Sequence, residues 1–237
     1  MFLKRVLPLA VALAAATTTA AATDAIEESM ARVIPDAQID SIEPSEIDGL
    51  YMVRYGTDIF YVSEDGNYLI QGNLVDLDSR ENLTEKSRRG VRGEMFAEIE
   101  DSELTVYSPN GETAGVLNIF TDPNCPYCRE VHQDIPEYLE AGIKVRYLMF
   151  PVLGQNSPEI MNRIWCADDR EDAMDRAKAG DTLSDIDGSC TTPQEQHMML
   201  GQALGVRGTP ALITGDGDQF SGYREPQEVI PRILGAN

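Results

Sequence analysis

The chain has 237 residues, of which 40 are acidic and 19 are Lys or Arg, giving a formal net charge of −21. This acidic excess argues against nucleic acid and anionic membrane surfaces as partners, because both carry the same sign of charge. The length fits one large domain or two modest ones, and the pattern along the chain favours two.

Residues 1–22 have the composition of a signal peptide. Lys4 and Arg5 precede an apolar run, residues 6–16, and a tail of small residues that ends at Ala22. The run is shorter than the roughly 20 apolar residues that a membrane-spanning helix needs, which argues against an anchor. We therefore expect cleavage after Ala22 and export to a compartment where disulfides persist.

Residues 23–79 predict a small α+β domain. Apolar residues fall at helical spacing between Asp24 and Ile34, and Pro35 ends that helix. Aromatic and β-branched segments separated by turn residues then predict an antiparallel meander, with strands at 47–55, 58–62 and 68–74. A core this small is marginal in isolation, and pairing with a second copy would stabilise it. We expect a dimerisation module.

Residues 80–103 are dense in Glu, Lys and Arg and carry few apolar side chains. This composition predicts an exposed linker helix between two domains, interrupted near Gly90 and Gly93 because glycine is a weak helix former. A flexible linker is the alternative interpretation.

Residues 104–237 have the pattern of an α/β domain. A helix that begins at a cysteine pair separates two buried apolar segments, which implies a parallel strand pair with a crossover. A β-hairpin and a closing helix follow, and together these elements make the thioredoxin arrangement. A helical insertion is expected at 158–180. The strands are expected at 104–108, 114–120, 144–150, 211–214 and 219–223.

Cys125 and Cys128 are expected to form a redox-active pair. They follow a buried strand and lie in the first turn of a helix, where unpaired N–H groups and the positive end of the helix dipole stabilise a thiolate. Cys125, nearer the helix start, is the predicted nucleophile, and Cys128 would resolve the mixed disulfide that it forms. Pro126 suits the first turn because it needs no N–H partner.

Two other interpretations of this pair are a zinc site and a structural disulfide. Zinc would need further close ligands, and neither the other cysteines nor His132 and His197 complete a usual ligand spacing. A structural disulfide across two intervening residues closes almost no loop and would restrain the unfolded chain little. We expect no metal and no cofactor.

Cys166 and Cys190 are expected to form a structural disulfide. A bridge between them closes a loop of about 25 residues, which the chain-entropy model values at roughly 3.5 kcal/mol, and would hold the helical insertion in place. The alternative is a second exchangeable pair, but neither cysteine begins a helix.

Several motifs occur in one order along the chain: residues 121–128, which read TDPNCPYC, His132, residues 145–148 with Phe150-Pro151, residues 164–167, and residues 204–210, which read LGVRGTP. Together they resemble the DsbC/DsbG family of protein disulfide isomerases. The resemblance implies that the Thr209–Pro210 peptide bond is cis and lies opposite the cysteines, where it would bind the substrate backbone. It also implies a homodimer joined through the N-terminal domains, misfolded disulfide-containing exported proteins as substrates, a membrane reductase of the DsbD type as electron donor, and a periplasmic location.

The dipeptide between the cysteines departs from this pattern. DsbC proteins usually carry Gly-Tyr, whereas Pro126-Tyr127 is the dipeptide of the related DsbG proteins, and these residues tune the reduction potential. The leading hypothesis is a thiol:disulfide interchange enzyme that reduces and isomerises incorrect disulfides. The alternatives are an oxidase or reductase that does not shuffle disulfides, and a DsbG-like chaperone in which binding or thiol reduction dominates.

Overall fold

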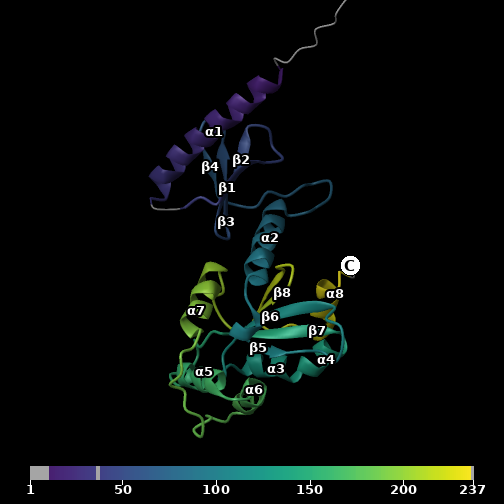
Figure 1. Cartoon of the computed structure of the whole chain (residues 1–237). Helices are drawn as coiled ribbons and strands as arrows, with labels where there is room; N and C mark the ends of the chain where they lie inside the picture. Colours follow the sequence, from purple (N-terminus) through teal and green to yellow (C-terminus); the bar gives the residue numbers. More distant parts are fainter. Residues whose placement is uncertain (1–10, 36–37, 236–237) are drawn as a thin grey trace, which may run out of the picture. The chain divides into compact units, whose positions relative to one another are not determined.

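The computed structural model describes residues 11–35 and 38–235, and for residues 11–21 it describes the backbone alone (Figure 1). The charged start of the expected signal peptide, Lys4 and Arg5, lies outside the described residues. The chain divides into two compact units, one ending at Glu85 and the other beginning at Lys86. Within the described ranges, no helix is both long and apolar enough to span a membrane.

The first unit packs one helix against a small antiparallel sheet. Helix α1 (Val11–Val33) contributes Ala22, Ile26 and Met30 to a core that it shares with apolar side chains of the sheet. It begins earlier than the helix expected from residue 24, because the alanine-rich segment before it also favours a helix. Cleavage after Ala22 would fall inside α1 and stays a prediction.

The sheet of the first unit has the strand order β1-β2-β3-β4. β2 and β3 follow the expected meander, joined at Gly56, whose positive φ of 56° suits glycine. β1 was not expected, because it is short and has no alternating apolar pattern. The third expected strand is reduced to two residues. The bounds are β1 (Ser41–Pro44), β2 (Leu50–Tyr55), β3 (Asp58–Ser63) and β4 (Leu69–Ile70).

The second unit contains a mixed sheet with the order β5-β7-β6-β8-β9. β6 pairs in parallel with β7 and antiparallel with β8, and β8 and β9 form the expected hairpin. This is the predicted thioredoxin-like α/β arrangement. The strands are β5 (Thr105–Tyr107), β6 (Gly115–Thr121), β7 (Ile143–Met149), β8 (Ala211–Thr214) and β9 (Gln219–Ser221).

Helices cover both faces of this sheet. The larger core joins the sheet to α3 (Pro126–Gln133), α4 (Ile135–Glu140), α5 (Ser157–Cys166), α6 (Arg170–Lys178) and α8 (Pro226–Ile233). The smaller core centres on Phe120 and Phe150 and receives side chains from α2 (Leu83–Ala97) and α7 (Gln194–Ala203). A 3₁₀ turn, η1 (Asp101–Glu103), precedes β5. Helices α5 and α6 form the expected insertion.

Helix α2 corrects the prediction of an exposed, interrupted linker helix. It runs through Gly90 and Gly93 without a break, and Phe96 is buried in the smaller core of the second unit. Arg89 pairs with Asp216 of the β8–β9 hairpin, and the Nε of Arg92 donates to the carbonyl oxygen of Gly217 at 2.6 Å. The charges along this segment therefore partly serve to attach the helix to the second unit.

The two glycines of α2 give a matched test of this packing. An added methyl group at Gly90 meets nothing within 4 Å, so Gly90→Ala is expected to raise the free energy of unfolding by about 0.5–1 kcal/mol. At Gly93 the methyl group would lie 3.2 Å from the backbone carbonyl of Asp216, so Gly93→Ala should lose that gain. Urea unfolding gives the free energy of unfolding of both variants. Equal stabilisation by the two substitutions would contradict the described packing.

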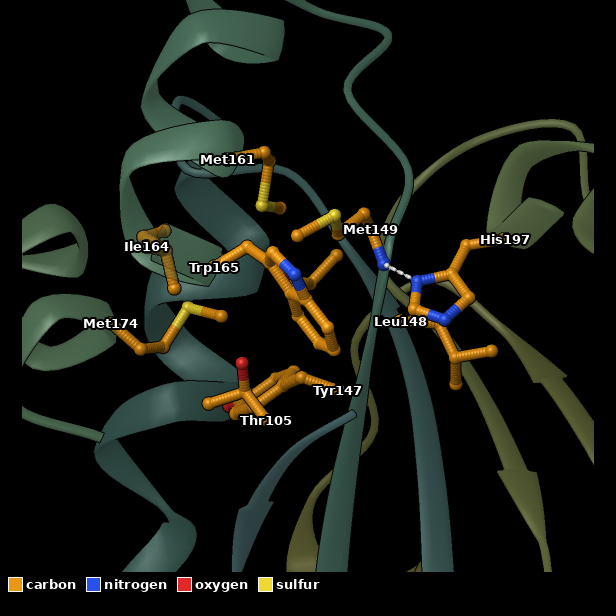
Figure 2. Close-up of a pocket in the computed structure, with 10 residues that line it drawn as sticks. Thr105, Tyr147, Leu148, Met149, Met161, Ile164, Trp165, Met174 and His197 are labelled. Atoms are coloured by element: carbon orange, nitrogen blue, oxygen red, sulfur yellow. Dashed lines mark hydrogen bonds between the residues drawn. The ribbon is translucent and has the colours of Figure 1, made fainter. Parts of the chain in front are cut away.

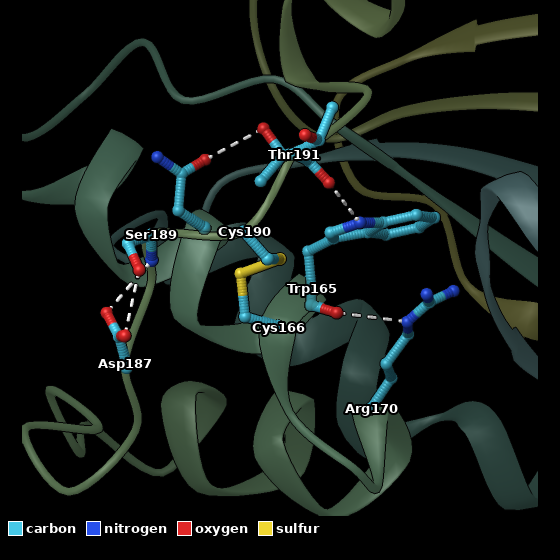
Figure 3. Close-up of a disulfide and its surroundings, with 9 residues drawn as sticks. Trp165, Cys166, Arg170, Asp187, Ser189, Cys190 and Thr191 are labelled. Atoms are coloured by element: carbon cyan, nitrogen blue, oxygen red, sulfur yellow. Dashed lines mark hydrogen bonds between the residues drawn. A yellow bond between two sulfur atoms is a disulfide. The ribbon is translucent and has the colours of Figure 1, made fainter.

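The Cys166–Cys190 disulfide joins the end of α5 to the segment that leads into α7 (Figure 3). Beside it, the indole N–H of Trp165 donates to the carbonyl oxygen of Thr191 at 3.1 Å. The guanidinium of Arg170 lies 3.5 Å from the centroid of the Trp165 ring. The disulfide and these contacts join the end of α5 to α6 and to the segment before α7.

Candidate active site

Cys125 is the N-cap residue of α3, and Pro126 occupies the first helical position. β6 ends at Thr121, and a turn then brings the cysteine to the helix start. The backbone N–H of Cys128 donates to the Sγ of Cys125 at 3.3 Å, so the sulfur takes the place of a capping oxygen. Both cysteines are free thiols and are buried, with Cys125 only 1% exposed.

The environment separates the acidities of the two thiols. The hydrogen bond from the Cys128 thiol lowers the pKa of Cys125 to about 6, and Thr209 and the backbone N–H of Cys128 act in the same direction. Burial raises the pKa of Cys128 far above its usual value. At neutral pH Cys125 is therefore the thiolate and Cys128 the thiol, which is the division that an attacking and a resolving cysteine need.

The structure brings Thr209 and Pro210 to the same place. The peptide bond between them is cis, and the Sγ of Cys125 lies 3.2 Å from the carbonyl oxygen of Thr209. Cys166 and Cys190 form their own disulfide and are not part of this group.

Asp122 organises the loops around the cysteines, and the sequence reasoning did not identify it. Its side chain is fully buried and accepts four hydrogen bonds, at distances of 2.7 to 2.9 Å. Two come from the loop after β7 and one each from the turn before Cys125 and the start of α5. The donors are the backbone N–H groups of Asn124, Val152 and Leu153 and the hydroxyl of Ser157.

Lys178, the last residue of α6, is a second group that the sequence reasoning missed. Its Nζ donates to Thr121 Oγ1 at 2.6 Å and to the carbonyl oxygen of Asp122 at 3.0 Å, although the residue is only 5% exposed. The position of Lys178 in the sequence could have identified it. Lys178 follows Met174 by four residues and so continues the buried face of α6, where a lysine is unusual.

His132 lies one turn after Cys128 and links two further polar side chains. Its Nδ1 is 3.0 Å from the hydroxyl of Tyr147, and its Nε2 is 3.0 Å from Asp175 Oδ1. Burial lowers the pKa of His132, and the charge of Lys178 adds to this effect. His132 is therefore neutral at pH 7 and has a structural hydrogen-bonding role here.

An enclosed space beside Tyr147 is part of the protein core. Figure 2 shows that Tyr147, Trp165, three methionines and His197 line it, and it leaves no volume for a ligand. The His197 Nδ1 accepts a hydrogen bond from the backbone N–H of Met149 at 3.1 Å. Across the described ranges, no cluster of three His, Cys, Asp or Glu side chains could hold a metal ion.

The acidity of Cys125 predicts how the reduced protein responds to pH. Thiolate absorbance should titrate with a midpoint near pH 6 and should vanish in Cys125→Ser. Because this pKa lies below the reference value of 9.0, ionised Cys125 stabilises the reduced protein fully above about pH 9, and the contribution is lost as the pH falls toward 6. The oxidised protein has no such group. Its free energy of unfolding, relative to that of the reduced protein, should therefore rise as the pH falls from about 9 toward 6. A midpoint near 9 would contradict the geometry.

Comparison with known proteins finds two family models in one chain. Residues 15–85 match the disulfide bond isomerase protein N-terminal domain, and residues 100–235 match a thioredoxin-like domain. The chain is 33% identical to the thiol:disulfide interchange protein DsbC of Dickeya dadantii, over 97% of this chain and 94% of the relative. It is also 33% identical to the DsbC of Escherichia coli K12, over 92% and 90% of the two chains.

A solved structure has a similar fold over part of the chain. The crystal structure of a disulfide interchange protein from Neisseria gonorrhoeae aligns with a TM-score of 0.51 and 24% identity, covering 57% of this chain and 99% of that one.

Proposed function

The chain belongs to the DsbC family of thiol:disulfide interchange proteins, and on that premise we propose that Cys125 and Cys128 are the redox pair with which it reduces and isomerises incorrect disulfides. The observation that supports this most directly is the position of Cys125. Its sulfur caps α3, its pKa is lowered to about 6, and it lies beside a cis-proline loop. These features favour a nucleophile over a structural cysteine.

The proposed reaction begins with the Cys125 thiolate. It attacks one sulfur of the substrate disulfide, so a mixed disulfide forms and the other substrate sulfur leaves as a thiolate. In isomerisation, another substrate thiolate attacks the mixed disulfide, forms a new substrate disulfide and regenerates reduced Cys125. In reduction, Cys128 displaces the substrate instead, which leaves the substrate with two thiols and the enzyme with a Cys125–Cys128 disulfide.

The loop at Thr209 and Pro210 is proposed to hold the substrate backbone beside Cys125. Proline has no N–H group, and the Thr209 carbonyl oxygen lies 3.2 Å from the Cys125 sulfur. An extended substrate segment would pair with this loop as an added strand, which leaves its side chains free to vary. Such recognition suits an enzyme with many substrates.

The family membership also makes this a dimerising enzyme that acts on exported proteins. We assign dimerisation to the N-terminal domain, residues 23–79, where Tyr68, Ile70 and Leu77 are exposed apolar side chains. The exposure of several large apolar side chains within residues 68–77 favours a protein interface. Export through a signal peptide at residues 1–22, a periplasmic location and reduction by a DsbD-type membrane protein complete the proposal. Residues 80–103 would connect this domain to the catalytic domain, residues 104–237.

Refolding of scrambled ribonuclease tests the proposed function. In a glutathione buffer, the purified dimer should restore ribonuclease activity faster than the buffer alone. A protein that is monomeric, or that leaves the scrambled disulfides unchanged while its Cys125 reacts, would contradict the isomerase assignment and favour a simple oxidase or reductase.

A chaperone role is the second candidate, favoured by an apolar surface near the active site. Tyr127 is 58% exposed, and Val152 and Leu153 lie on the loop that Asp122 anchors. The double variant Cys125→Ser with Cys128→Ala separates binding from exchange. If it protects unfolded proteins from aggregation as well as the wild type does, binding is an independent function.

A further inference from the structure

Lys178 is a buried cation whose hydrogen-bond acceptors are both uncharged. Its Nζ reaches Thr121 Oγ1 at 2.6 Å and the carbonyl oxygen of Asp122 at 3.0 Å. None of the carboxylates in the described part of the chain forms an ion pair with it. A buried ammonium group without a paired carboxylate is costly, and the fold alone would favour an apolar residue at this position.

Several titratable groups face Lys178 and change its pKa. The thiols of Cys128 and Cys125 favour its charged form most, in that order, and the Asp122 carboxylate follows, while Arg129 opposes them. His132 also senses its charge, and the Tyr147 ring lies 5.8 Å from its Nζ. When ionised, the sulfur atoms of the redox pair therefore favour the charged form of Lys178 more than the Asp122 carboxylate does.

Thr121 connects Lys178 to the resolving cysteine. Its side chain is fully buried at the end of β6, where its Oγ1 accepts from Lys178, and the same hydroxyl lowers the pKa of Cys128 by favouring its thiolate. A hydroxyl donates one hydrogen bond and accepts others, so it can pass a proton between the two groups. The three side chains come from β6, α3 and α6, and Thr121 is the group that acts on both Lys178 and Cys128.

We propose that Lys178 is a positioning residue of the resolving step, which takes the proton of Cys128 through the Thr121 hydroxyl so that Cys128 attacks the mixed disulfide. This inference rests on the proposed function and adds a proton acceptor to it.

Protons and electrons balance in this resolving step. The Cys128 S–H bond breaks as its proton passes to Thr121 Oγ1, and the hydroxyl proton of Thr121 passes to the neutral Lys178 amine. The Cys128 thiolate then forms a bond to Cys125 Sγ, and the bond between Cys125 and the substrate sulfur breaks. The substrate leaves as a thiolate with that electron pair, reduced, while the cysteine pair is oxidised.

The ionisation of Lys178 agrees with this role. Burial lowers its pKa to about 8, so roughly a tenth of the molecules carry a neutral amine at pH 7. Burial also keeps Cys128 protonated, which is why the resolving thiol needs a nearby base. The rate of the resolving step should therefore increase as the pH rises toward 8.

A coloured aromatic disulfide separates the two steps in one experiment. Attack by Cys125 releases the first coloured thiolate, and attack by Cys128 on the resulting mixed disulfide releases the second. Lys178→Met and Thr121→Val should each slow the second release by about tenfold or more and remove its rise toward pH 8, with a much smaller effect on the first. Thr121→Ser, which restores the hydroxyl, should restore the rate. Lys144→Met, on an unrelated lysine that pairs with Asp101, should change neither release.

Several results would overturn the inference. An unchanged second release and pH profile in folded Lys178→Met contradicts it, as does a normal profile in Thr121→Val. Valine has the shape of threonine and favours strands, so Thr121→Val decides the question even if Lys178→Met does not fold. Failure of the first release in the wild type would instead overturn the proposed function.

Discussion

Replacing Cys125 with serine is expected to abolish disulfide exchange, with a loss of at least about 10³-fold in the rate of attack on a model disulfide. A serine hydroxyl is not ionised at neutral pH and forms no mixed disulfide. Cys128→Ser should behave differently, because Cys125 can still attack but nothing in the protein resolves the product. Mass spectrometry should therefore detect an accumulating mixed disulfide in Cys128→Ser and none in Cys125→Ser.

The other cysteine pair provides the matched control for this result. The double variant Cys166→Ser with Cys190→Ser removes the disulfide beside Trp165 but leaves the site intact. It should lose stability, and the folded fraction should keep the exchange rate of the wild type. If Cys125→Ser retained exchange while this variant lost it, the assignment of the redox pair would be wrong.

Replacing Asp122 with asparagine is expected to have the largest effect on stability, a loss of about 2–4 kcal/mol in the free energy of unfolding. The buried carboxylate accepts four hydrogen bonds, and an amide nitrogen in place of one oxygen faces donors instead of accepting from them. The loop of Val152 and Leu153 and the turn before Cys125 lose their common anchor. The attack by Cys125 should slow as well, which kinetics with the same model disulfide would measure.

An exposed aspartate controls for the change of charge alone. Asp187 accepts from the backbone N–H of Ser189 at 3.1 Å and from its hydroxyl at 2.8 Å, outside the active site. Asp187→Asn should change stability and exchange little. Equal effects of Asp122→Asn and Asp187→Asn would show that net charge, and not the buried hydrogen bonds, is responsible.

The amino-acid pattern predicted the local features of this protein well. A buried strand, a turn and a cysteine with proline after it specify a helix start, where the neighbouring N–H groups contribute to stabilising a thiolate. The strand pairs joined at Gly56 and at residues 215–218 depend likewise on nearby residues. The cis bond at Pro210 was predicted because the family resemblance located it, since few X-Pro bonds are cis.

Only the tertiary structure decided which distant side chains meet. Lys178 reaches Thr121 across 57 positions, Asp122 reaches Val152 across 30, and Arg89 reaches Asp216 across 127. No periodicity or spacing encodes such pairs, because they form only when the sheet brings together segments that are far apart in the chain. The sequence by itself therefore predicted a cysteine pair at a helix start and the fold that presents it. The buried groups that set the chemistry of that pair, and the attachment of α2 to the second unit, depend on packing.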